Sequence, residues 1–440
     1  MASFDLSPPS GTRDFLPEDA KARERVMRTI KDVFERYGFG PLETPAFERI
    51  EILTGKYGDE GDKLIFKILK RGEKAALGEV DFTLRYDLTV PLARVVGEYR
   101  HKLGAIWKRY QIAPVWRADR PAKGRFREFY QCDVDVIGAK GPVADAEVLL
   151  AVGEALATVG LPGFTIKLNS RNVLRGLMEA YGIAAEQQKA TLIGLDKLDK
   201  MSLDDVMKEL EGAGIAAASI SALAADIGAA DPAARVRDRV AGNATGALGL
   251  AEVDALYALV APTLAGGAIK FEPFLARGLD YYTGQVFEVA APGLNSSIAS
   301  GGRYDGLVGM FSKDAVPACG GSLGLDRILL LLDEKAGARP PLGIPQVVVA
   351  VWDEAARGAS LKLASDVRAT GASVEVFAGD GDIGKQLKYA VGKQARVALI
   401  VGPDEAAKGL VQVKDLASKG QQQVPRAEVA AAVAALLAAK

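Results

Sequence analysis

Two alternating runs, residues 106–117 and 125–137, flank the polar segment ADRPAKG and constrain the fold more than any other feature. Such runs around a short turn predict a β-hairpin, whose strands place successive side chains on opposite faces. In the second run one face is apolar, and the other carries polar groups and a phenyl ring. The sequence therefore predicts a hairpin with one face in the core and the other facing a ligand. The apolar face comprises Phe126, Tyr130, Cys132, Val134 and Val136, and the polar face comprises Arg125, Arg127, Phe129, Gln131, Asp133 and Asp135.

The charge of this hairpin indicates the kind of ligand. Between Lys102 and Phe129 the chain has eight Lys or Arg and two acidic residues, whereas the whole chain has a formal net charge of −1. Positive charge concentrated in one place predicts phosphate binding, and a phenyl ring beside guanidinium groups can stack on a base. A solvated basic edge strand is the alternative that charge alone leaves open. Gln131 and Asp135 on the same face favour the ligand.

The rare residue types exclude several kinds of site. The chain has one histidine, His101, and two cysteines, Cys132 and Cys319, which lie far apart in sequence. This composition excludes a multi-histidine metal site, a CxxC zinc pattern and a disulfide framework. There is no apolar run of about 18 residues, so no membrane span is expected. The N-terminus has neither an apolar core nor a basic amphipathic leader, and we therefore expect a cytoplasmic protein.

A Pro- and Gly-rich segment, AGARPPLGIP at residues 336–345, predicts the boundary between two domains. After it, in residues 342–440, four apolar runs alternate with helix patterns. This alternation predicts an α/β domain of about 100 residues with a mostly parallel sheet. Within residues 1–341 we expect helices at 19–37 and 143–159, a strand that runs into a helix at 82–99, a helical stretch at about 185–265, and strands at 271–289 and 294–300.

The stretch FLARGLDYYTGQVFEV, residues 274–289, places charged residues in an apolar run. Arg277 and Asp280 need partners there, because burial of an unpaired charge is costly, and a polar ligand pocket supplies partners better than packing does. The alternative is that the glycines form turns and the tyrosines belong to the core. Since adjacent strand residues point to opposite faces, one of Tyr281 and Tyr282 could be core and the other a pocket wall.

A second glycine-rich stretch, GGSLGLDRILLLLDE at residues 320–334, predicts a glycine turn that leads into a helix. It is neither a P-loop nor a GxGxxG motif, and a packing turn is the simpler interpretation. Arg327, in the first turn of this apolar helix, is harder to explain by packing, because arginine is rarely buried without a partner.

Taken together, these motifs resemble those of class II aminoacyl-tRNA synthetases, and specifically of histidyl-tRNA synthetases, over nearly the whole chain. TPAFERIE with Pro45 is similar to motif 1, WRADRPAKGRFREFYQ to motif 2 and GGSLGLDRILLLL to motif 3. ARGLDYYTG and ASGGRYDG (299–306) are similar to the two histidine-specific motifs. The resemblance implies an α+β catalytic domain, residues 1–341, with an antiparallel sheet, flanking helices and a helical insertion at about 170–265. Residues 342–440 would be an anticodon-binding α/β domain.

The resemblance also implies substrates and roles. ATP, used with Mg²⁺, would be held by Arg117 at the α-phosphate, by Arg125 at a further phosphate and by Arg327 at the γ-phosphate. Phe129 would stack on adenine, with Arg327 near the other face. The chain would supply no metal ligand that the sequence identifies.

L-histidine would bind beside the nucleotide. Arg277 would approach its carboxylate and the reacting phosphate, so that Arg277, Arg117 and Arg327 are the implied catalytic residues. Tyr281 and Tyr282 would shape the imidazole pocket. The segment RYDLTVP (85–91) becomes part of the site. The ammonium would lie among Asp87, Thr89, Gln131 and Asp135, with Leu88 in the same segment.

The implied partners are tRNA(His) and a second copy of the chain, paired through motif 1. The sequence departs from the commoner bacterial pattern at Ala122, where a glutamine is expected. Three alternatives remain: a histidine-binding regulatory paralogue of ATP phosphoribosyltransferase, a prolyl or threonyl synthetase of the same subgroup, and a simple RNA-binding module. Arg277 and the C-terminal domain disfavour the first, the lack of zinc ligands disfavours the threonyl enzyme, and the pocket residues disfavour the last.

Overall fold

The computed structural model describes residues 4–198, 201–276, 281–312, 315–336 and 345–438. The chain forms two compact units, residues 1–337 and 338–440. The predicted boundary after residue 341 falls among residues 337–344, which lie outside the described residues. It therefore stays a prediction.

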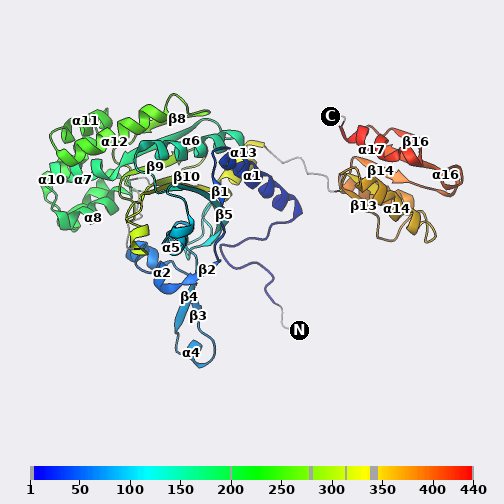
Figure 1. The fold of residues 1–440 in the computed structure, drawn as a ribbon, viewed down its shortest axis with the longest axis horizontal. Coiled ribbons are helices and arrows are strands. Elements are labelled where there is room, and N and C mark those ends of the chain that lie inside the picture. Colours follow the sequence, from blue (N-terminus) through cyan, green and yellow to red (C-terminus); the bar gives the residue numbers. More distant parts are fainter. Residues whose placement is uncertain (1–3, 199–200, 277–280, 313–314, 337–344, 439–440) are drawn as a thin grey trace. The chain divides into compact units, whose positions relative to one another are not determined.

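An eight-stranded sheet forms the centre of the first unit (Figure 1). In sheet order its strands are β1 (Gly40–Pro41), β5 (Trp107–Trp116), β6 (Glu128–Ile137), β11 (Ala318–Gly324), β10 (Ala299–Arg303), β9 (Gln285–Ala290), β7 (Phe164–Ser170) and β8 (Gly267–Phe271). Neighbours run antiparallel except β1 with β5 and β7 with β8. The predicted hairpin is confirmed, since β5 and β6 pair along their whole length. The predicted antiparallel sheet with flanking helices is confirmed as well.

The apolar face of β6 lies in the main core, as its alternation predicts. Cys132, Val134 and Val136 pack there with apolar side chains from three helices that cover this face of the sheet. The helices are α1 (Pro17–Arg36), α6 (Pro142–Thr158) and α13 (Leu325–Ala336). With one face buried in this way, the register of the hairpin is fixed, because a shift by one residue would expose the apolar side chains. The other face of β6 is left for polar side chains.

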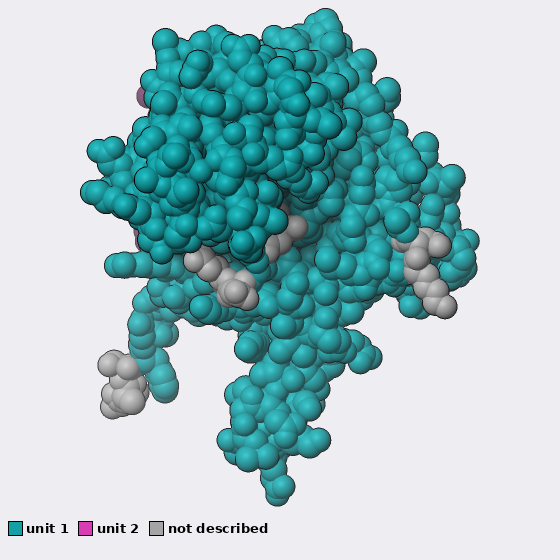
Figure 2. Space-filling model, turned by 90° about the vertical axis from the view of Figure 1, so that its left-hand side faces the viewer, with its two compact units in different colours: residues 1–337 teal, residues 338–440 magenta. Residues whose placement is uncertain are grey.

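A second core lies near α5 (Thr89–Tyr99), where Val90, Leu92 and Val96 pack against Tyr304 and Leu307. Beside it, a small sheet projects from the unit and is visible as a narrow extension in Figures 1 and 2. Its strands, in order, are β2 (Phe47–Arg49), β4 (Val80–Leu84) and β3 (Lys67–Leu69). Short helices lie between these strands, namely α2 (Ile50–Leu53), α3 (Gly58–Lys63) and α4 (Glu73–Ala76). Two further short helices, η1 (Arg100–Lys102) and η2 (Val308–Met310), follow α5 and β10.

The helical stretch expected at about 185–265 is present and begins earlier. Its helices are α7 (Arg171–Ala180), α8 (Ala185–Leu195), α9 (Leu203–Gly212), α10 (Ala217–Ile227), α11 (Pro232–Val240) and α12 (Ala244–Val260). A buried carboxylate, Asp226, joins three of them, because it accepts hydrogen bonds from Tyr181 at 2.8 Å, Arg239 at 2.9 Å and Arg235 at 3.2 Å.

Two local predictions are wrong. The glycines of GGSLG form strand β11 rather than a turn. They are needed for close approach: a Cβ on Gly320 would lie 1.9 Å from Asp135 Oδ1, and one on Gly321 would lie 2.7 Å from the Phe287 ring. The strands expected at 271–289 and 294–300 are shorter, since β9 begins at Gln285 and β10 begins at Ala299. Tyr281 and Tyr282 therefore do not lie in a strand.

The second unit has a five-stranded sheet in the order β13 (Val374–Val376), β12 (Val347–Val349), β14 (Val397–Ile400), β15 (Leu410–Asp415) and β16 (Gln421–Pro425). The prediction of a mostly parallel sheet holds for β13, β12 and β14 only, because β15 and β16 pair antiparallel. The helices are α14 (Arg357–Arg368), α15 (Ile383–Gly392), α16 (Pro403–Lys408), η3 (Arg426–Glu428) and α17 (Val429–Ala438). Within the described ranges, no helix is both long and apolar enough to cross a membrane.

Candidate active site

A cavity of about 510 Å³ lies over the polar face of β6 and β11, bordered by the start of α5 and the start of α13. It brings together ten of the residues that the sequence predicts: Asp87, Thr89, Arg117, Arg125, Phe129, Gln131, Asp135, Tyr281, Tyr282 and Arg327. Leu88 does not line the cavity, because it is fully buried at the start of α5. Arg277 lies outside the described residues.

The floor of the cavity consists of side chains from β6 and small residues of β11. Asp133 is the direct cross-strand partner of Ser322, and Asp135 is the partner of Gly320. Gln131 Nε2 donates a hydrogen bond to Ser322 Oγ at 3.1 Å. The missing side chain of Gly320 leaves the space that Asp135 occupies. The three polar side chains of β6 are therefore held at fixed positions two residues apart.

Three buried carboxylates gather at one end of this floor. Asp87, Asp133 and Asp135 are each about 2% exposed. Beneath them lies Arg109, fully buried, with Nη2 2.7 Å from Asp135 Oδ2 and 4.0 Å from Asp133 Oδ2. Burial raises the pKa of Asp87 and of Asp135. Burial, together with the charge of Asp135, raises the pKa of Asp133 to about 7, and the Arg109 guanidinium opposes this rise.

Tyrosines enclose the same end. Tyr57 donates to Asp87 Oδ1 at 2.9 Å, and the Tyr304 hydroxyl donates to Asp135 Oδ1. Tyr281 and Tyr282 lie with ring centres 4.9 Å apart, and both line the cavity. The prediction that one of the pair could be core and the other a pocket wall does not separate them, because both line the cavity and both pack in the second core, Tyr281 buried and Tyr282 partly buried. Burial raises the pKa of Tyr57, Tyr281 and Tyr304 well above its usual value, so these hydroxyls stay neutral.

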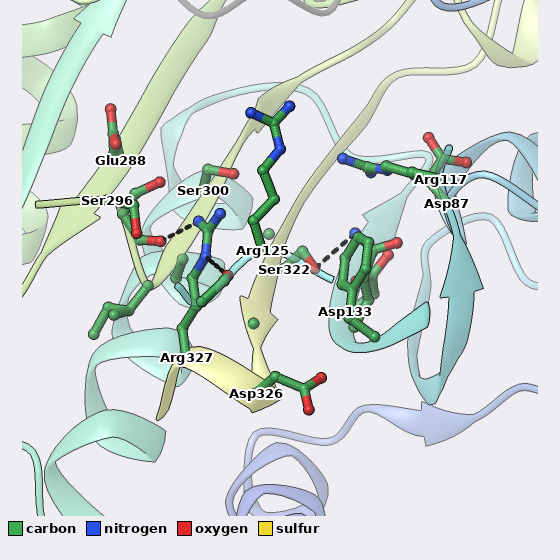
Figure 3. Close-up of a pocket in the computed structure, with 18 of the residues that line it drawn as sticks. Asp87, Arg117, Arg125, Asp133, Glu288, Ser296, Ser300, Ser322, Asp326 and Arg327 are labelled. Atoms are coloured by element: carbon green, nitrogen blue, oxygen red, sulfur yellow. Dashed lines mark hydrogen bonds between the residues drawn. The ribbon is translucent and has the colours of Figure 1, made fainter. Parts of the chain in front are cut away.

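Guanidinium groups occupy the rest of the cavity (Figure 3). Arg117 stacks over Tyr86 and Phe129, with its guanidinium carbon 4.2 Å and 5.2 Å from the ring centres. Arg327 donates to Ser297 O at 2.6 Å and to Gly124 O at 3.2 Å. Arg125 pairs with Asp119 at 2.6 Å and is half exposed. In Figure 3, Arg117 and Asp87 lie on one side, and Arg327, Ser296 and Glu288 lie on the other.

The tip of the hairpin differs from the prediction. Phe126, expected in the core, lines the cavity beneath the guanidinium of Arg13 at 3.4 Å. Arg127, expected on the polar face, instead donates to the carbonyls of Asp119 and Ser10. Both predictions fail because β6 begins at Glu128, so the two-residue period does not extend to these positions.

Most of the basic residues of the hairpin do not face the cavity. Of the eight basic residues between Lys102 and Phe129, three line the cavity: Arg117, Lys123 and Arg125. Arg109 lies beneath the floor, paired with Asp135, and Lys108 pairs with Glu147 at 3.0 Å outside it. The local excess of positive charge thus overstates the charge that meets a ligand.

Asp326, directly before Arg327, holds the start of α13 in place. Its Oδ1 accepts from Arg23 at 2.7 Å and from Arg13, and its Oδ2 accepts the Tyr130 backbone N–H at 2.9 Å. These contacts join the N-terminal segment, α1 and β6 to one carboxylate. They hold the start of α13, and with it Arg327, in place beside the cavity that Asp326 also lines.

Several lining residues were not assigned from the sequence: Asp119, Asp133, Glu288, Ser300, Ser322 and the supporting Tyr304 and Arg109. Asp133 has a signal, since it falls on the polar face of β6. Tyr304 lies in the ASGGRYDG motif. Glu288 and Ser300 are direct cross-strand partners on β9 and β10, a pairing that only the sheet order reveals.

The cavity thus has a carboxylate end that suits a cationic group and a guanidinium end that suits phosphates, with aromatic rings near both. Among the described lining residues there is no histidine or cysteine to act as a nucleophile. The arrangement can hold an amino acid and a nucleotide side by side.

The chain is similar to known proteins over nearly its whole length. Residues 11–328 match the family model described as histidyl-tRNA synthetase, and residues 346–436 match the one described as anticodon binding domain. A histidine–tRNA ligase from Gloeobacter violaceus is 39% identical, over 98% of this chain and 99% of that protein. The crystal structure of histidyl-tRNA synthetase from Nostoc sp. PCC 7120 superposes with a TM-score of 0.80 at 30% identity, covering 98% of this chain and 100% of that one. An ATP phosphoribosyltransferase regulatory subunit/histidyl-tRNA synthetase from Bacillus halodurans C superposes with a TM-score of 0.74 at 24% identity, covering 88% and 97% of the two chains, which shows a shared fold alone.

Proposed function

The chain belongs to the histidyl-tRNA synthetase family, and on that premise we propose that it is a histidine–tRNA ligase. It activates L-histidine with ATP, releases pyrophosphate, and transfers histidine to the 3′ end of tRNA(His). The observation that carries this proposal is one cavity with carboxylates at one end and guanidiniums at the other. Such a cavity fits an amino acid ammonium and a nucleotide phosphate at the same time.

ATP binds at the guanidinium end. Arg117 holds the α-phosphate, Arg125 holds a further phosphate, and Arg327 holds the γ-phosphate. Phe129 stacks on the adenine. The contacts of Arg327 to two backbone carbonyls support this assignment, because they fix the guanidinium before the nucleotide arrives.

Histidine binds at the carboxylate end. Its ammonium faces Asp87, Thr89, Gln131 and Asp135, and its imidazole lies against Tyr281 and Tyr282. The neutral hydroxyl of Tyr281 suits an imidazole, which both donates and accepts hydrogen bonds. A pocket whose buried polar groups need partners rejects ligands that cannot supply them.

The first chemical step needs no nucleophilic side chain. A carboxylate oxygen of histidine attacks the α-phosphorus, a P–O bond forms, and the bond to the pyrophosphate oxygen breaks. The chain contributes by positioning the reactants and by stabilising charge at phosphorus, which are large effects in a preorganised site. Arg117 stabilises the α-phosphate oxygens, and we assign Arg277, on sequence grounds, to the carboxylate and the same phosphate.

A Mg²⁺ ion remains part of the proposal. The described residues contain no group of three or more His, Cys, Asp or Glu side chains that could hold a metal. An ion that arrives on ATP needs fewer protein ligands, because Mg²⁺ keeps several waters and phosphate oxygens. Glu288 and Ser300, adjacent on β9 and β10 and lining the cavity, offer two oxygen ligands. When bound, the ion would neutralise charge on the phosphates.

The second unit would read the anticodon. Its parallel strands β12 and β14 are neighbours with β13 on the other side of β12, so the strand order reverses at their carboxyl ends. Ligands bind at such points in open α/β sheets. Trp352 follows β12, is 47% exposed, and stands against Gly402, whose Cβ would lie 3.2 Å from its ring. We assign Trp352 as the ring on which an unpaired base stacks.

A homodimer is part of the proposal, formed over the projecting sheet. Phe47 and Phe82 are 53% and 36% exposed there, and their ring centres lie 5.7 Å apart. Leu69 on the neighbouring strand is 55% exposed. A second copy would cover this apolar surface. Sedimentation should give a dimer that Phe47→Glu dissociates, whereas a wild-type monomer at all concentrations would contradict the assignment.

The test of the proposed function is ATP–pyrophosphate exchange measured with each of the twenty amino acids. Exchange should depend on histidine, and exchange with proline or threonine instead would overturn the choice of substrate. Binding of histidine without exchange would favour the regulatory paralogue. That alternative is disfavoured, because the related protein with high coverage is named a histidine–tRNA ligase. A cytoplasmic location follows from this function as an expectation.

A further inference from the structure

At the carboxylate end of the cavity, three buried acceptor oxygens have neither a hydrogen-bond donor nor a cation within 4 Å among the described residues, whereas Asp135 Oδ2, which also lacks a hydrogen-bond donor, lies 2.7 Å from Arg109 Nη2. The three are Oδ2 of Asp87, Oε1 of Gln131 and Oδ1 of Asp133. All three side chains line the cavity, and each residue is at most 9% exposed. Buried acceptors without donors are rare in folded proteins, because such groups lose hydrogen bonds to water and gain nothing. A ligand that donates several hydrogen bonds at once would resolve all three.

Asp135, by contrast, is already occupied. The Tyr304 hydroxyl donates to its Oδ1, and the Arg109 guanidinium pairs with its Oδ2 at 2.7 Å. Arg109 is fully buried, so it cannot turn to solvent for another partner. Asp133 is different, because Arg109 lies farther away, at 4.0 Å, and only its Oδ2 faces that group. Of the two aspartates on β6, Asp133 is the one with an oxygen, Oδ1, that has neither a hydrogen-bond donor nor a close cation among the described residues.

We propose that Asp133 is the principal counter-ion of the substrate ammonium, which donates its three N–H groups to Asp87, Gln131 and Asp133. An ammonium has three donors and no acceptor, which matches three acceptors without donors. The assignment rests on the proposed function and changes one part of it: Asp135 supports the floor of the cavity and does not contact the ammonium.

The charges around Asp133 agree with this assignment. The carboxylates that face it are Asp135 on the same strand and Asp87 from the segment before α5, and the buried cation is Arg109 on β5. Arg117, which acts on Asp87, is the next cation. Among the described residues, therefore, three carboxylates lie near two guanidiniums, and burial raises the pKa of each carboxyl. A ligand ammonium favours the ionised form of these carboxylates, which a neutral or anionic ligand group does not do.

Ser322 sets the position of the Asp133 carboxylate. It is the direct cross-strand partner of Asp133, and its hydroxyl already accepts a hydrogen bond from Gln131. A hydrogen bond between Ser322 and the Asp133 carboxylate completes the chain of contacts. The side chains of Gln131 and Asp133 are therefore linked, and both oxygens without donors belong to one rigid group.

The experiment compares two ligands on two proteins by calorimetry. L-histidine carries the ammonium, and 3-(imidazol-4-yl)propanoate is the same molecule without the amino group. In the full chain, Asp133→Asn should weaken histidine binding about 10- to 100-fold, the range for a hydrogen bond to a charged group. Binding of the propanoate should change less than about threefold, because it makes no contact that the variant removes. In exchange kinetics, KM for histidine should rise while kcat changes little.

Asp145→Asn is the matched control. Asp145 is also a buried carboxylate paired with an arginine, Arg303 at 2.5 Å, but it does not line the cavity. Its removal should leave the ratio of the two affinities unchanged. If Asp133→Asn fails to fold, Asp133→Ser gives the same comparison with a smaller side chain.

An unchanged ratio in the Asp133 variant would overturn the assignment, and so would an equal loss for both ligands. Failure of the proposed function has a different signature, because the wild-type protein would then either bind no histidine or bind it without supporting ATP–pyrophosphate exchange. The titrations and the exchange assay on the wild-type protein therefore distinguish the two failures.

Discussion

Two adjacent glycines in β11 allow a sharp test of how the floor of the cavity is built. Gly320 and Gly321 point to opposite faces of the sheet, one toward the cavity and one toward the core. A Cβ on Gly320 would lie 1.9 Å from Asp135 Oδ1, 2.5 Å from its Cγ and 2.8 Å from the backbone carbonyl of Val134. A Cβ on Gly321 would lie 2.7 Å from the Phe287 ring. The substitutions Gly320→Ala and Gly321→Ala therefore add the same methyl group to different sides.

The expected magnitudes differ because the displaced neighbours differ. In Gly321→Ala the ring and α6 must shift, which is overpacking and costs about 1–3 kcal/mol of unfolding free energy. In Gly320→Ala the methyl group displaces Asp135 from Arg109, a buried pair at 2.7 Å. Breaking such a pair costs about 3–5 kcal/mol, but Asp133, 4.0 Å away, can partly replace the lost carboxylate. We expect a total of about 2–4 kcal/mol for Gly320→Ala.

Ligand affinity separates the two variants more clearly than stability does. Displacement of Asp135 disturbs the side chains of β6 that face the ligand, so Gly320→Ala should weaken histidine binding about tenfold or more, equivalent to about 1.4 kcal/mol. Gly321→Ala should change it less than about threefold. Urea unfolding gives the stabilities, and calorimetry gives the affinities. Equal losses of affinity in both variants would refute the reasoning, as would full affinity in Gly320→Ala.

Four further outcomes are expected. The raised pKa of Asp133, about 7, means that the folded protein holds a proton that the unfolded chain releases near pH 4. The free energy of unfolding therefore falls as the pH rises from about 4 to about 7. Asp133→Asn should stabilise the ligand-free protein by up to about 4 kcal/mol at pH 8 and hardly at all at pH 4, as measured by urea unfolding. Arg277→Ala should reduce exchange kcat about 100-fold or more while changing ATP affinity little, and an unchanged rate would remove Arg277 from the mechanism. Deletion of residues 342–440 should spare ATP–pyrophosphate exchange and abolish tRNA charging, with a thermal melt as the folding control. Trp352→Ala should raise KM for tRNA about tenfold without affecting exchange. Equal loss of exchange and charging in either variant would contradict the assignment of tRNA recognition to the second unit.

The sequence predicts the hairpin and its ligand-facing side because one feature decides both. The alternation along β6 is long enough to fix the buried face, and Cys132, Val134 and Val136 are buried as expected. The same alternation predicts that Gln131 and Asp135 lie on the ligand-facing side, where both line the cavity. The prediction fails at Phe126 and Arg127, where the strand has not yet begun and the chain bends toward Arg13 and Asp119.

The role of the β11 glycines could not be predicted, because a glycine has two structural uses that look alike in sequence. One use is a turn, where glycine tolerates backbone angles that other residues avoid. The other is close approach, where any Cβ would collide. Gly320 is of the second kind, and the deciding group, Asp135, lies 185 positions earlier in the chain. Only the pairing of β11 with β6 brings them together.

Arg109 shows the same limit for charge. Counted along the chain, it belongs to a basic cluster that suggests phosphate binding. In the fold it lies beneath the carboxylates and is paired with Asp135, so it stabilises negative charge rather than binding it from outside. A buried pair of this kind contributes little net stability, because desolvation offsets most of the attraction. Its consequence here is positional: by occupying Asp135, Arg109 leaves Asp133 under-compensated, and the pocket retains a negative charge that an incoming ammonium can neutralise.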